Sequence, residues 1–567
     1  MAVVNDAPAI LILGARSLPT ARRIQAALPG AEVYGLKSRV EGADIPFEEF
    51  GETLRGLYEA GRPIIALCAA GIVIRSLSPL LQNKRAEPPV LAVAEDGSAV
   101  VPLLGGLSGV NVLAREIGAA LGTVPAITTT GEIRFGTCLI NPPDGYVLRN
   151  PAAGKTFIAD LLAGAKMRVE GEAPWFADAN LPIADDGTLT ARITHQDVAP
   201  GENELLFHPR SIVIGIGRPQ PDLADVIRRA LAQTQLSIHS LALLLAREDD
   251  FADPHVATAA AALGLPVRFV AARSAEELVL AAVPSPALSV TIEQLAIGVA
   301  ETPAEVTPIG RKRGRLAVVG LGPGAAAMMV PAVRREIDQA QDILGYETYV
   351  KMAGPLRPDQ IVHGSDNREE LARARHGFEL AASGRSVVIV SSGDPGVFAM
   401  AAAVLEALDD TDKPEWHGVD LAILPGVSAA MAAAAKIGAP LGHDFCVISL
   451  SDNLKPWATI LDRLRHAAEG DFAMALYNPI SKARPWQLGE ALDLLRQYRA
   501  PETLVVLGRD VGRPDEKIGH TTLGELTTEM VDSRTVVIVG SSMTRAIAKP
   551  DGSAWVYTPR WYGTKPA

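Results

Sequence analysis

The chain contains a short apolar run that leads directly into a glycine-rich loop, and a second run and loop repeat this pattern. The first is Arg315-Leu-Ala-Val-Val-Gly-Leu-Gly-Pro-Gly324 and the second is Val390-Ser-Ser-Gly-Asp-Pro-Gly396. The first run is continuous and partly β-branched, which predicts a buried strand of a parallel sheet. Glycines let the backbone turn sharply and let a ligand approach the main chain. The pattern therefore predicts an α/β fold with a candidate site at the carboxyl edge of its sheet, where both loops are expected to meet.

The first loop differs from the common nucleotide-binding fingerprints. Gly320, Gly322 and Gly324 lack the spacing of G-x-G-x-x-G, and no Lys-Ser/Thr pair follows them as in a P-loop. Pro331 then predicts the start of a helix. A tight packing turn is the alternative interpretation of such a loop when it is taken alone.

From Gly320 onward the chain resembles the tetrapyrrole (corrin-pathway) methylases, and among them the enzymes that methylate carbon 17. The segments that carry the resemblance stand in order: GLGPG, SSGDPGV (391–397), LPGVSA (424–429), GAPLGHDF (438–445), ISLSD (448–452), LYNPISKAR (476–484) and IVGSSMTR (538–545). The resemblance implies a two-lobed methylase fold, with one lobe over 315–424 and a second lobe and tail over 425–567. In the second lobe the sequence predicts strands at 446–450, 472–477, 503–507 and 535–539, and a helix at 487–498.

The resemblance also implies an activity and a cofactor. The reaction would be S-adenosylmethionine-dependent methylation of precorrin-3B, or its cobalt analogue, at carbon 17 with ring contraction to precorrin-4 in cobalamin biosynthesis. The cofactor would lie between the lobes, and the residues that match the family's motifs for it are Pro323, Ser392, Gly393, Asp394, Val397, Ser428, Ala429, Asn478 and Gly508. For Asp394 the alternative interpretation is a cap on the Gly-Asp-Pro-Gly turn.

Methyl transfer to carbon needs no protein nucleophile, but the implied ring contraction requires an acid or base near a tertiary hydroxyl. His443 and Asp444 are the candidate pair. A purely structural histidine is the alternative, because adjacent residues on a strand point to opposite faces. Basic residues that are candidates to bind the carboxylates of the substrate are Lys482, Arg484, Arg509 and Arg513.

The N-terminal half resembles a second family, the cobalt-precorrin-5A hydrolases. AGIVIR (70–75), GGLSGVN (105–111) and AITTTGE (126–132) carry the resemblance over 1–132, and SIVIGIGRPQP (211–221) carries it over 210–302. Residues 133–209 form a weakly matched middle domain, and 303–314 are expected to be a linker. The family pattern has histidine at the position of Gly106, aspartate at that of Glu132 and cysteine at that of Arg218.

These departures leave two hypotheses for the N-terminal half. Loss of a histidine removes the side chain best suited to proton transfer near neutral pH. The half is therefore predicted either to keep a hydrolase activity or to bind and carry a tetrapyrrole without catalysis.

Composition restricts the remaining classes of protein. The formal net charge of −12 argues against a nucleic-acid surface, and the three cysteines lie far apart, without a metal-binding spacing. The start lacks a basic region, and no apolar run reaches the roughly 20 residues that span a bilayer. We therefore expect a cytoplasmic α/β protein, and the resemblance implies a homodimer. A methylase that acts on another corrin position is the remaining alternative.

Overall fold

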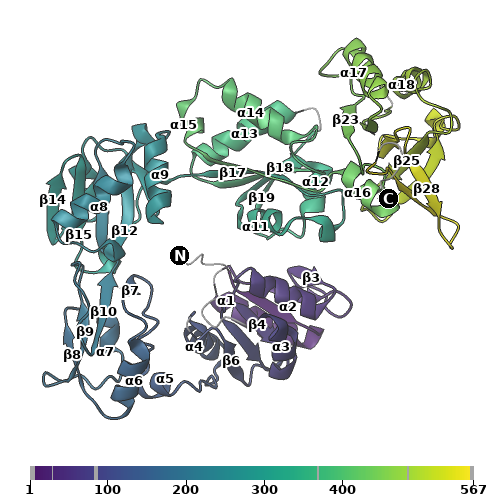
Figure 1. Ribbon diagram of the computed structural model, residues 1–567. Coiled ribbons are helices and arrows are strands. Elements are labelled where there is room, and N and C mark those ends of the chain that lie inside the picture. The colour runs from purple at the N-terminus through teal and green to yellow at the C-terminus, as the bar shows by residue number, and fades with distance from the viewer. Residues whose placement is uncertain are drawn as a thin grey trace. The chain divides into compact units, whose positions relative to one another are not determined.

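A computed structural model of the chain describes residues 7–28, 30–81, 87–106, 108–366, 369–481 and 484–561. It divides into two compact units, Met1–Arg313 and Gly314–Ala567, and each unit is described by itself. Helices and strands alternate in both units, as the sequence predicts (Figure 1). Of the helices within the described ranges, none has the length and apolar character that a bilayer crossing demands.

The first unit begins with a six-stranded sheet between two layers of helices. Its elements are β1 (Ala9–Ile12), α1 (Leu18–Ala27), β2 (Glu32–Leu36), β3 (Ile45–Phe47), α2 (Phe50–Glu59), β4 (Ile64–Leu67), α3 (Ala70–Leu77), β5 (Val90–Val93), β6 (Val100–Leu104) and α4 (Val110–Leu121). The strand order is β3-β2-β1-β4-β5-β6, and only β6 runs antiparallel to its neighbour. Ile10 and Ile12 belong to the core with α1 and α4, whereas Ala9 and Leu11 belong to the core with α2 and α3. Both faces are buried, which explains the uninterrupted apolar strands.

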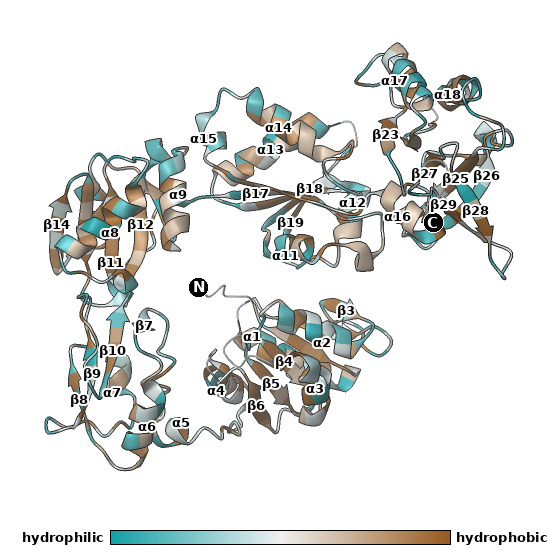
Figure 2. Ribbon diagram, viewed as in Figure 1, coloured by the Kyte–Doolittle hydropathy of each residue, from teal (hydrophilic) through white to brown (hydrophobic). Residues whose placement is uncertain are grey.

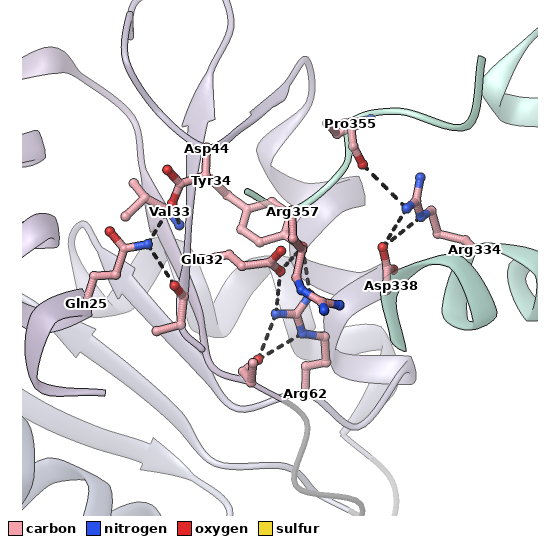
Figure 3. Close-up of polar contacts among 12 residues, drawn as sticks. Gln25, Glu32, Val33, Tyr34, Asp44, Arg62, Arg334, Asp338, Pro355 and Arg357 are labelled. Atoms are coloured by element: carbon pink, nitrogen blue, oxygen red, sulfur yellow. Dashed lines mark hydrogen bonds and ion pairs between the residues drawn. The ribbon is translucent and has the colours of Figure 1, made fainter. Parts of the chain in front are cut away.

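A buried ion pair secures the start of β2. Arg62 donates a hydrogen bond to the Glu32 carboxylate at 2.9 Å, to the Tyr34 hydroxyl at 2.7 Å and to the Ala7 carbonyl (Figure 3). Glu32 is 6% exposed and Arg62 is 9% exposed. Because removal of one partner would leave the other charge buried and uncompensated, the pair holds β2 against the segment that precedes β4.

The middle of the first unit is a smaller sheet with an aromatic core. Its elements are α5 (Thr130–Phe135), β7 (Tyr146–Leu148), α6 (Gly154–Leu162), β8 (Met167–Glu170), α7 (Pro174–Ala177), β9 (Leu189–Ile193) and β10 (Glu204–Pro209). The strand order is β7-β10-β9-β8, and only β7 is antiparallel to its neighbour. Phe157, Phe176 and Phe207 are buried together in its core.

The first unit ends with a mixed sheet in the order β14-β15-β11-β12-β13-β16. Its elements are β11 (Ile212–Ile216), α8 (Leu223–Gln233), β12 (Leu241–Arg247), α9 (Pro254–Leu263), β13 (Val267–Val270), α10 (Ala275–Ala282), β14 (Leu288–Ile292), β15 (Leu295–Val299) and β16 (Arg311–Lys312). Figure 2 shows the hydrophobic character of β11 and β12, which are almost wholly buried. Strand β16 lies within the expected linker and pairs with β13. The Arg311 guanidinium lies 3.9 Å from the centroid of the Phe251 ring, a cation–π contact that favours this pairing.

The second unit begins with a five-stranded, wholly parallel sheet in the order β19-β18-β20-β17-β21. Its elements are β17 (Arg315–Gly320), α11 (Pro331–Gln339), β18 (Asp342–Tyr346), α12 (Glu347–Ala353), β19 (Ile361–Ser365), α13 (Glu370–Ala382), β20 (Ser386–Ser391), α14 (Met400–Asp409), α15 (Pro414–His417) and β21 (Asp420–Leu424). Leu316 and Val318 belong to the core with α13 and α14, whereas Ala317 and Val319 belong to the core with α11 and α12. The predicted buried strand and the helix start at Pro331 are confirmed.

A second sheet, in the order β23-β24-β27-β25-β26, completes this unit together with a small sheet, β22-β29-β28. The elements are α16 (Ala429–Ile437), β22 (Gly438–Ala439), β23 (Phe445–Ser449), α17 (Trp457–Glu469), β24 (Ala473–Tyr477), α18 (Gln487–Leu495), β25 (Leu504–Arg509), β26 (Lys517–Thr522), β27 (Thr535–Val539), β28 (Arg545–Ala548) and β29 (Ala554–Tyr557). The four predicted strands correspond to β23, β24, β25 and β27, and the predicted helix to α18, which ends three residues earlier than expected. Helices α17 and α18 share one core with the larger sheet and α16 shares another.

In the first unit, burial disfavours the protonated form of three histidines near β10. His208 is fully buried, its Nδ1–H donates to the Thr194 carbonyl at 2.8 Å, and its Nε2 lies 3.4 Å from the Ser237 hydroxyl. The ring of His239 stacks on that of His208 with centroids 5.7 Å apart. Burial lowers the pKa of His208, of His239 and of His195.

We expect acid to loosen the structure around β10. A histidine whose pKa is lowered by folding stabilises the folded state above its ordinary pKa of about 6.5, and this stability is lost as the pH falls below that value. Hydrogen exchange of the β9 and β10 amides, corrected for the intrinsic rate, should lose about tenfold in protection between about pH 7.5 and about pH 5.5. His208→Gln should lose less, because an amide does not titrate. An equal loss in both proteins would contradict the expectation.

Candidate active site

Three loops meet at the carboxyl edge of the parallel sheet. Strand β17 lies between β20 and β21, so the loops that follow these three strands are neighbours. The first two loops pair directly, because Gly322 and Gly393 exchange backbone hydrogen bonds of 3.2 and 2.8 Å. The Leu321 N–H also donates to the Ser391 carbonyl at 2.8 Å. The two glycine loops therefore meet at one edge, as predicted.

Glycine is required where these loops touch. A Cβ atom on Gly320 would lie 2.5 Å from the carbonyl oxygen of Gly393 and 2.8 Å from the nitrogen of Gly426. A Cβ atom on Gly426 would lie 2.6 Å from the carbonyl oxygen of Gly320. Because the opposing atoms are backbone atoms, no flexible side chain can move aside to admit the extra carbon.

The carboxylate of Asp394 joins the second loop to the third. One oxygen accepts from the Gly396 N–H at 2.8 Å, which is the turn cap considered from the sequence. The other oxygen accepts from the Gly426 N–H at 3.0 Å. Asp394 therefore does more than close its own turn, because it also fixes the distance between two loops.

The larger sheet of the second lobe presents its own carboxyl edge. Strands β23 and β24 are parallel, and β24 and β25 both run antiparallel to β27, so all three strands end on the same side. At this edge Asn478 donates to the Ser449 hydroxyl at 3.1 Å. Gly508 is buried against α16, where an added Cβ would lie 2.9 Å from that of Ala433. The hydroxyl of Ser428 caps the start of α16 by accepting from the Met431 N–H at 3.4 Å.

Contacts within the second unit bring the two edges together. An added Cβ on Gly512 would lie 3.1 Å from the Cγ of Pro323, so the first glycine loop packs on the loop after β25. The Tyr477 hydroxyl, at the end of β24, accepts from the Ala430 N–H at 2.8 Å. The ring of Phe398 lies 5.8 Å from that of Tyr477, centroid to centroid. The predicted cofactor residues therefore all lie on loops or element ends that surround one region of this unit.

Two of the predicted substrate-binding arginines are engaged by carboxylates. Arg509 donates to Asp532 at 2.8 Å, and its second nearby carboxylate is that of Asp510, at 3.2 Å. The hydrogen bond to Asp532 raises the pKa of Arg509. Arg513 lies 4.0 Å from Asp510 and donates weakly to the Pro323 carbonyl at 3.5 Å. Both arginines therefore hold the loop after β25 in place.

Arg484 differs from these two arginines. Its Nη1 atom is buried and has no hydrogen-bond partner among the described residues. A buried guanidinium nitrogen without a partner is costly, so it points to a group that the described residues do not supply. Lys482, the fourth predicted residue, lies outside the described residues.

His443 and Asp444 are not brought to this region. They immediately precede β23, whereas Ser449 and Asn478 stand at the other end of the paired strands. The Nδ1 atom of His443 accepts from the Asp444 N–H at 2.8 Å, and the Asp444 side chain is 81% exposed. This placement favours the structural interpretation of the histidine.

Three non-glycine residues around the site adopt left-handed backbone conformations. Phe398, Asn478 and Asp510 have φ values of 54°, 51° and 48°, and they follow β20, β24 and β25. Such conformations cost on the order of 1–3 kcal/mol each and gather at functional sites. Sequence reasoning missed Phe398, because nothing in a sequence marks a bulky residue for a conformation it normally avoids. It also missed Gly426, although the LPGVSA segment contains that glycine.

In the first unit, Glu132 lies in a polar cluster. It is 4% exposed and accepts from Asn111 at 2.7 Å and from Arg115 at 2.9 Å. At Gly106, where the resembled family has histidine, an added Cβ would meet no atom of the described residues within 4 Å. The turn at Arg218 follows β11 and is exposed. The cluster is therefore electrostatically satisfied as it stands, and the position of Gly106 has room for a side chain.

The cysteines do not have the properties of nucleophiles. Burial raises the pKa of Cys68 to about 11, and burial together with Glu132 raises that of Cys138 to about 11. Burial also raises the pKa of Cys446. These thiols stay protonated near neutral pH, and the thiolate is the reactive form. In the parts of the chain that the structure describes, no group of three or more His, Cys, Asp or Glu side chains is placed to hold a metal ion.

Comparison with known proteins identifies relatives of both halves. The profile of the tetrapyrrole (corrin/porphyrin) methylases matches residues 315–527, and the profile of the cobalamin synthesis G N-terminal domain matches residues 52–132. A precorrin-3B C(17)-methyltransferase from Sinorhizobium is 55% identical over 249 residues, which are 44% of this chain and 97% of that protein.

Other relatives match the same part of the chain. The cobalamin biosynthesis protein CobIJ of Mycobacterium bovis is 47% identical over 263 residues, which are 45% of this chain and 50% of that protein, so the chain spans half of that relative. A solved structure of the methyltransferase CobJ is 52% identical, with a TM-score of 0.41, and the match covers 43% of this chain and all of that one.

The glycine contacts lead to a stability prediction. Gly426→Ala should lower the melting temperature of the second unit by roughly 5 °C, because the new methyl group meets backbone on two sides. Gly519→Ala is the matched control, since an added Cβ there meets nothing within 4 Å. Differential scanning calorimetry of both variants would measure the shifts, and equal melting temperatures would refute the claim that the loops need this glycine.

Proposed function

The chain belongs to the tetrapyrrole (corrin/porphyrin) methylases, and on that premise we propose that its second unit transfers a methyl group from S-adenosylmethionine to carbon 17 of precorrin-3B, or of its cobalt analogue, with ring contraction to precorrin-4. The observation that carries the proposal is the 55% identity to a precorrin-3B C(17)-methyltransferase that the chain covers almost completely. The meeting of three glycine loops at one edge supports it, because such an edge suits a nucleoside ligand.

The residues at this edge fit the cofactor. Gly393 has a φ of 68°, and a Cβ placed on it would stand 3.7 Å from the Cα of Ser428, so the gap between these loops is open to main-chain contact without side-chain bulk. Helix α16 begins at Ala429, and a helix start suits a carboxylate. S-adenosylmethionine supplies a methyl group that is already electrophilic, so no protein nucleophile is needed. The residues proposed to hold it are Pro323, Ser392, Gly393, Asp394, Val397, Ser428, Ala429, Asn478 and Gly508.

The chain's own contribution to the reaction is binding and orientation. Holding donor and acceptor in line and excluding water can lower the activation barrier by roughly 7–11 kcal/mol. Arg484 is the proposed partner of a substrate carboxylate, because its buried Nη1 lacks one in the described protein. Arg509 and Arg513 already contact protein carboxylates, those of Asp532 and Asp510. They could bind a substrate carboxylate only if each guanidinium group served both partners. Lys482 stays a prediction.

For the ring contraction, the predicted pair His443 and Asp444 stays a prediction. Its place at the amino end of β23 favours a structural role over proton transfer at the opposite edge. The predicted homodimer also stays a prediction, and sedimentation velocity would test it. Two exposed apolar side chains of the second unit, Ile547 (53% exposed) and Trp555 (46% exposed), lie on paired strands β28 and β29 and are the first positions to replace.

For the first unit we keep two proposals, hydrolysis of cobalt-precorrin-5A or tetrapyrrole binding without catalysis. The match of residues 52–132 to the cobalamin synthesis G N-terminal profile supports both. The exposed Arg218 and the side-chain-free Gly106 favour binding, since neither position carries the cysteine or histidine of the resembled pattern. The full chain should be given the ring-contracted lactone: release of acetaldehyde would establish the hydrolase, and binding without release would support the carrier.

The methylation has a direct test. Full-length protein incubated with methyl-labelled S-adenosylmethionine and precorrin-3B should place the label on carbon 17, as read by NMR. Incorporation at another carbon would assign the enzyme to a different corrin position. No incorporation into any tetrapyrrole would refute the proposal.

Replacement of Asp394 should weaken cofactor binding through the loops. In Asp394→Asn one carboxylate oxygen becomes an amide group, so only one of the Gly396 and Gly426 N–H groups keeps its acceptor. We expect the Kd for S-adenosylhomocysteine, measured by calorimetry, to rise about tenfold. Asp412→Asn, an exposed site in the same lobe, is the control and should leave the Kd unchanged. An unaltered Kd in both variants would reduce Asp394 to a turn residue.

A further inference from the structure

An aromatic side chain stands exposed beside the site and is not used by the proposed cofactor contacts. Phe398 is 50% exposed although it lies between a buried strand, β20, and the helix α14, one face of which is buried. Its φ of 54° is unfavourable for a bulky residue. A phenylalanine that both strains its backbone and leaves half of its ring in water contributes less to stability than a buried one would. The position therefore points to a role in binding.

The ring of Phe398 is nevertheless held in a defined place. It lies 5.8 Å from the ring of Tyr477, at an interplanar angle of 59°. Tyr477 is fixed in turn by the hydrogen bond of 2.8 Å from the Ala430 N–H, in the first turn of α16. Phe398 is thus linked through Tyr477 to the start of the helix that the proposed cofactor site uses.

A cation accompanies this ring. The Lys455 ammonium lies 5.7 Å from the centroid of Phe398. Burial is the main cause that lowers the pKa of Lys455, and the positive charge of Arg463 adds to it. Among the described residues, the Lys455 ammonium has no carboxylate partner within 4.0 Å. An apolar face with uncompensated positive charge beside it is complementary to a broad ring system that carries carboxylates.

We propose that Phe398 is a substrate-positioning residue, whose exposed ring packs against one face of the tetrapyrrole while Lys455 pairs with a carboxylate at its rim. The inference rests on the proposed function, since it assumes a tetrapyrrole acceptor. Its distinctive consequence is that the ring serves the acceptor and not the methyl donor. Loss of the ring should therefore change the KM for the tetrapyrrole and leave donor affinity unchanged.

The test compares two variants of the full-length protein. Phe398→Ala removes the ring and keeps most of the backbone strain, whereas Phe398→Gly removes both. Both should raise the KM for precorrin-3B about tenfold at saturating S-adenosylmethionine. The Kd for S-adenosylhomocysteine should stay within about twofold of the wild-type value. Phe398→Gly should melt no lower than Phe398→Ala, which separates the binding effect from any change in folding.

Matched controls identify the source of an effect. Phe472→Ala removes a comparable phenylalanine, 38% exposed, that precedes β24 at its amino end and should leave KM unchanged. Lys455→Met should raise KM more at low than at high ionic strength, because its contribution is electrostatic. A KM for both Phe398 variants equal to that of Phe472→Ala would overturn the proposal. So would a loss of S-adenosylhomocysteine affinity in Phe398→Ala, because the ring would then support the donor site.

A second readout separates this inference from the proposed reaction. Uroporphyrin, a stable tetrapyrrole with many carboxylates, can be titrated into each protein and its binding followed by fluorescence. If the wild-type protein methylates no tetrapyrrole, the proposed function fails. Weaker uroporphyrin binding by both Phe398 variants than by Phe472→Ala would still support a tetrapyrrole-binding role for Phe398. Equal uroporphyrin affinity in all of these proteins would overturn the proposed role of Phe398, whether or not the enzyme is active.

Discussion

The site of the second unit depends on the close approach of backbone segments from three separate loops. Gly320, Gly393 and Gly426 come within distances that a single methyl group would prevent, and the Asp394 carboxylate holds the second and third loops together. Backbone packed on backbone cannot relax as side chains do, so the geometry is set by the chain itself. The parallel order of β20, β17 and β21 makes this meeting possible, because it puts three strand ends side by side.

Much of the fold could be predicted because the decisive signals are local. Composition and length predict the strand at 315–320 and the strands of the second lobe, and the structure has them where they were expected. The structure of the segment 303–314 was harder to predict. Its prolines and charges are typical of a linker, yet Arg311 and Lys312 pair with β13, and the contact that favours this pairing is with Phe251, some 60 residues earlier in the chain. A contact of that kind has no local signature.

The same distinction separates the predicted and the missed parts of the site. The glycine loops were identified from motifs, but the second hydrogen bond of Asp394 depends on Gly426, which only the folded sheet brings near. Adjacency in sequence suggested His443 and Asp444 as a pair, and only the strand direction shows that they lie at the amino end of β23. Phe398 was missed because the features that distinguish it are its exposure and its backbone conformation, and neither property can be read from the residue type.

Strand β16 has a consequence for how the two units share one chain. It ends at Lys312 and β17 begins at Arg315, so Arg313 and Gly314 alone separate the last strand of one unit from the first strand of the next. With so short a tether, the effective concentration of one unit around the other is on the order of millimolar. This value does not depend on how much of the protein the cell makes. The fusion also fixes their ratio at one to one. The two units therefore stay together after synthesis and need not find each other by diffusion.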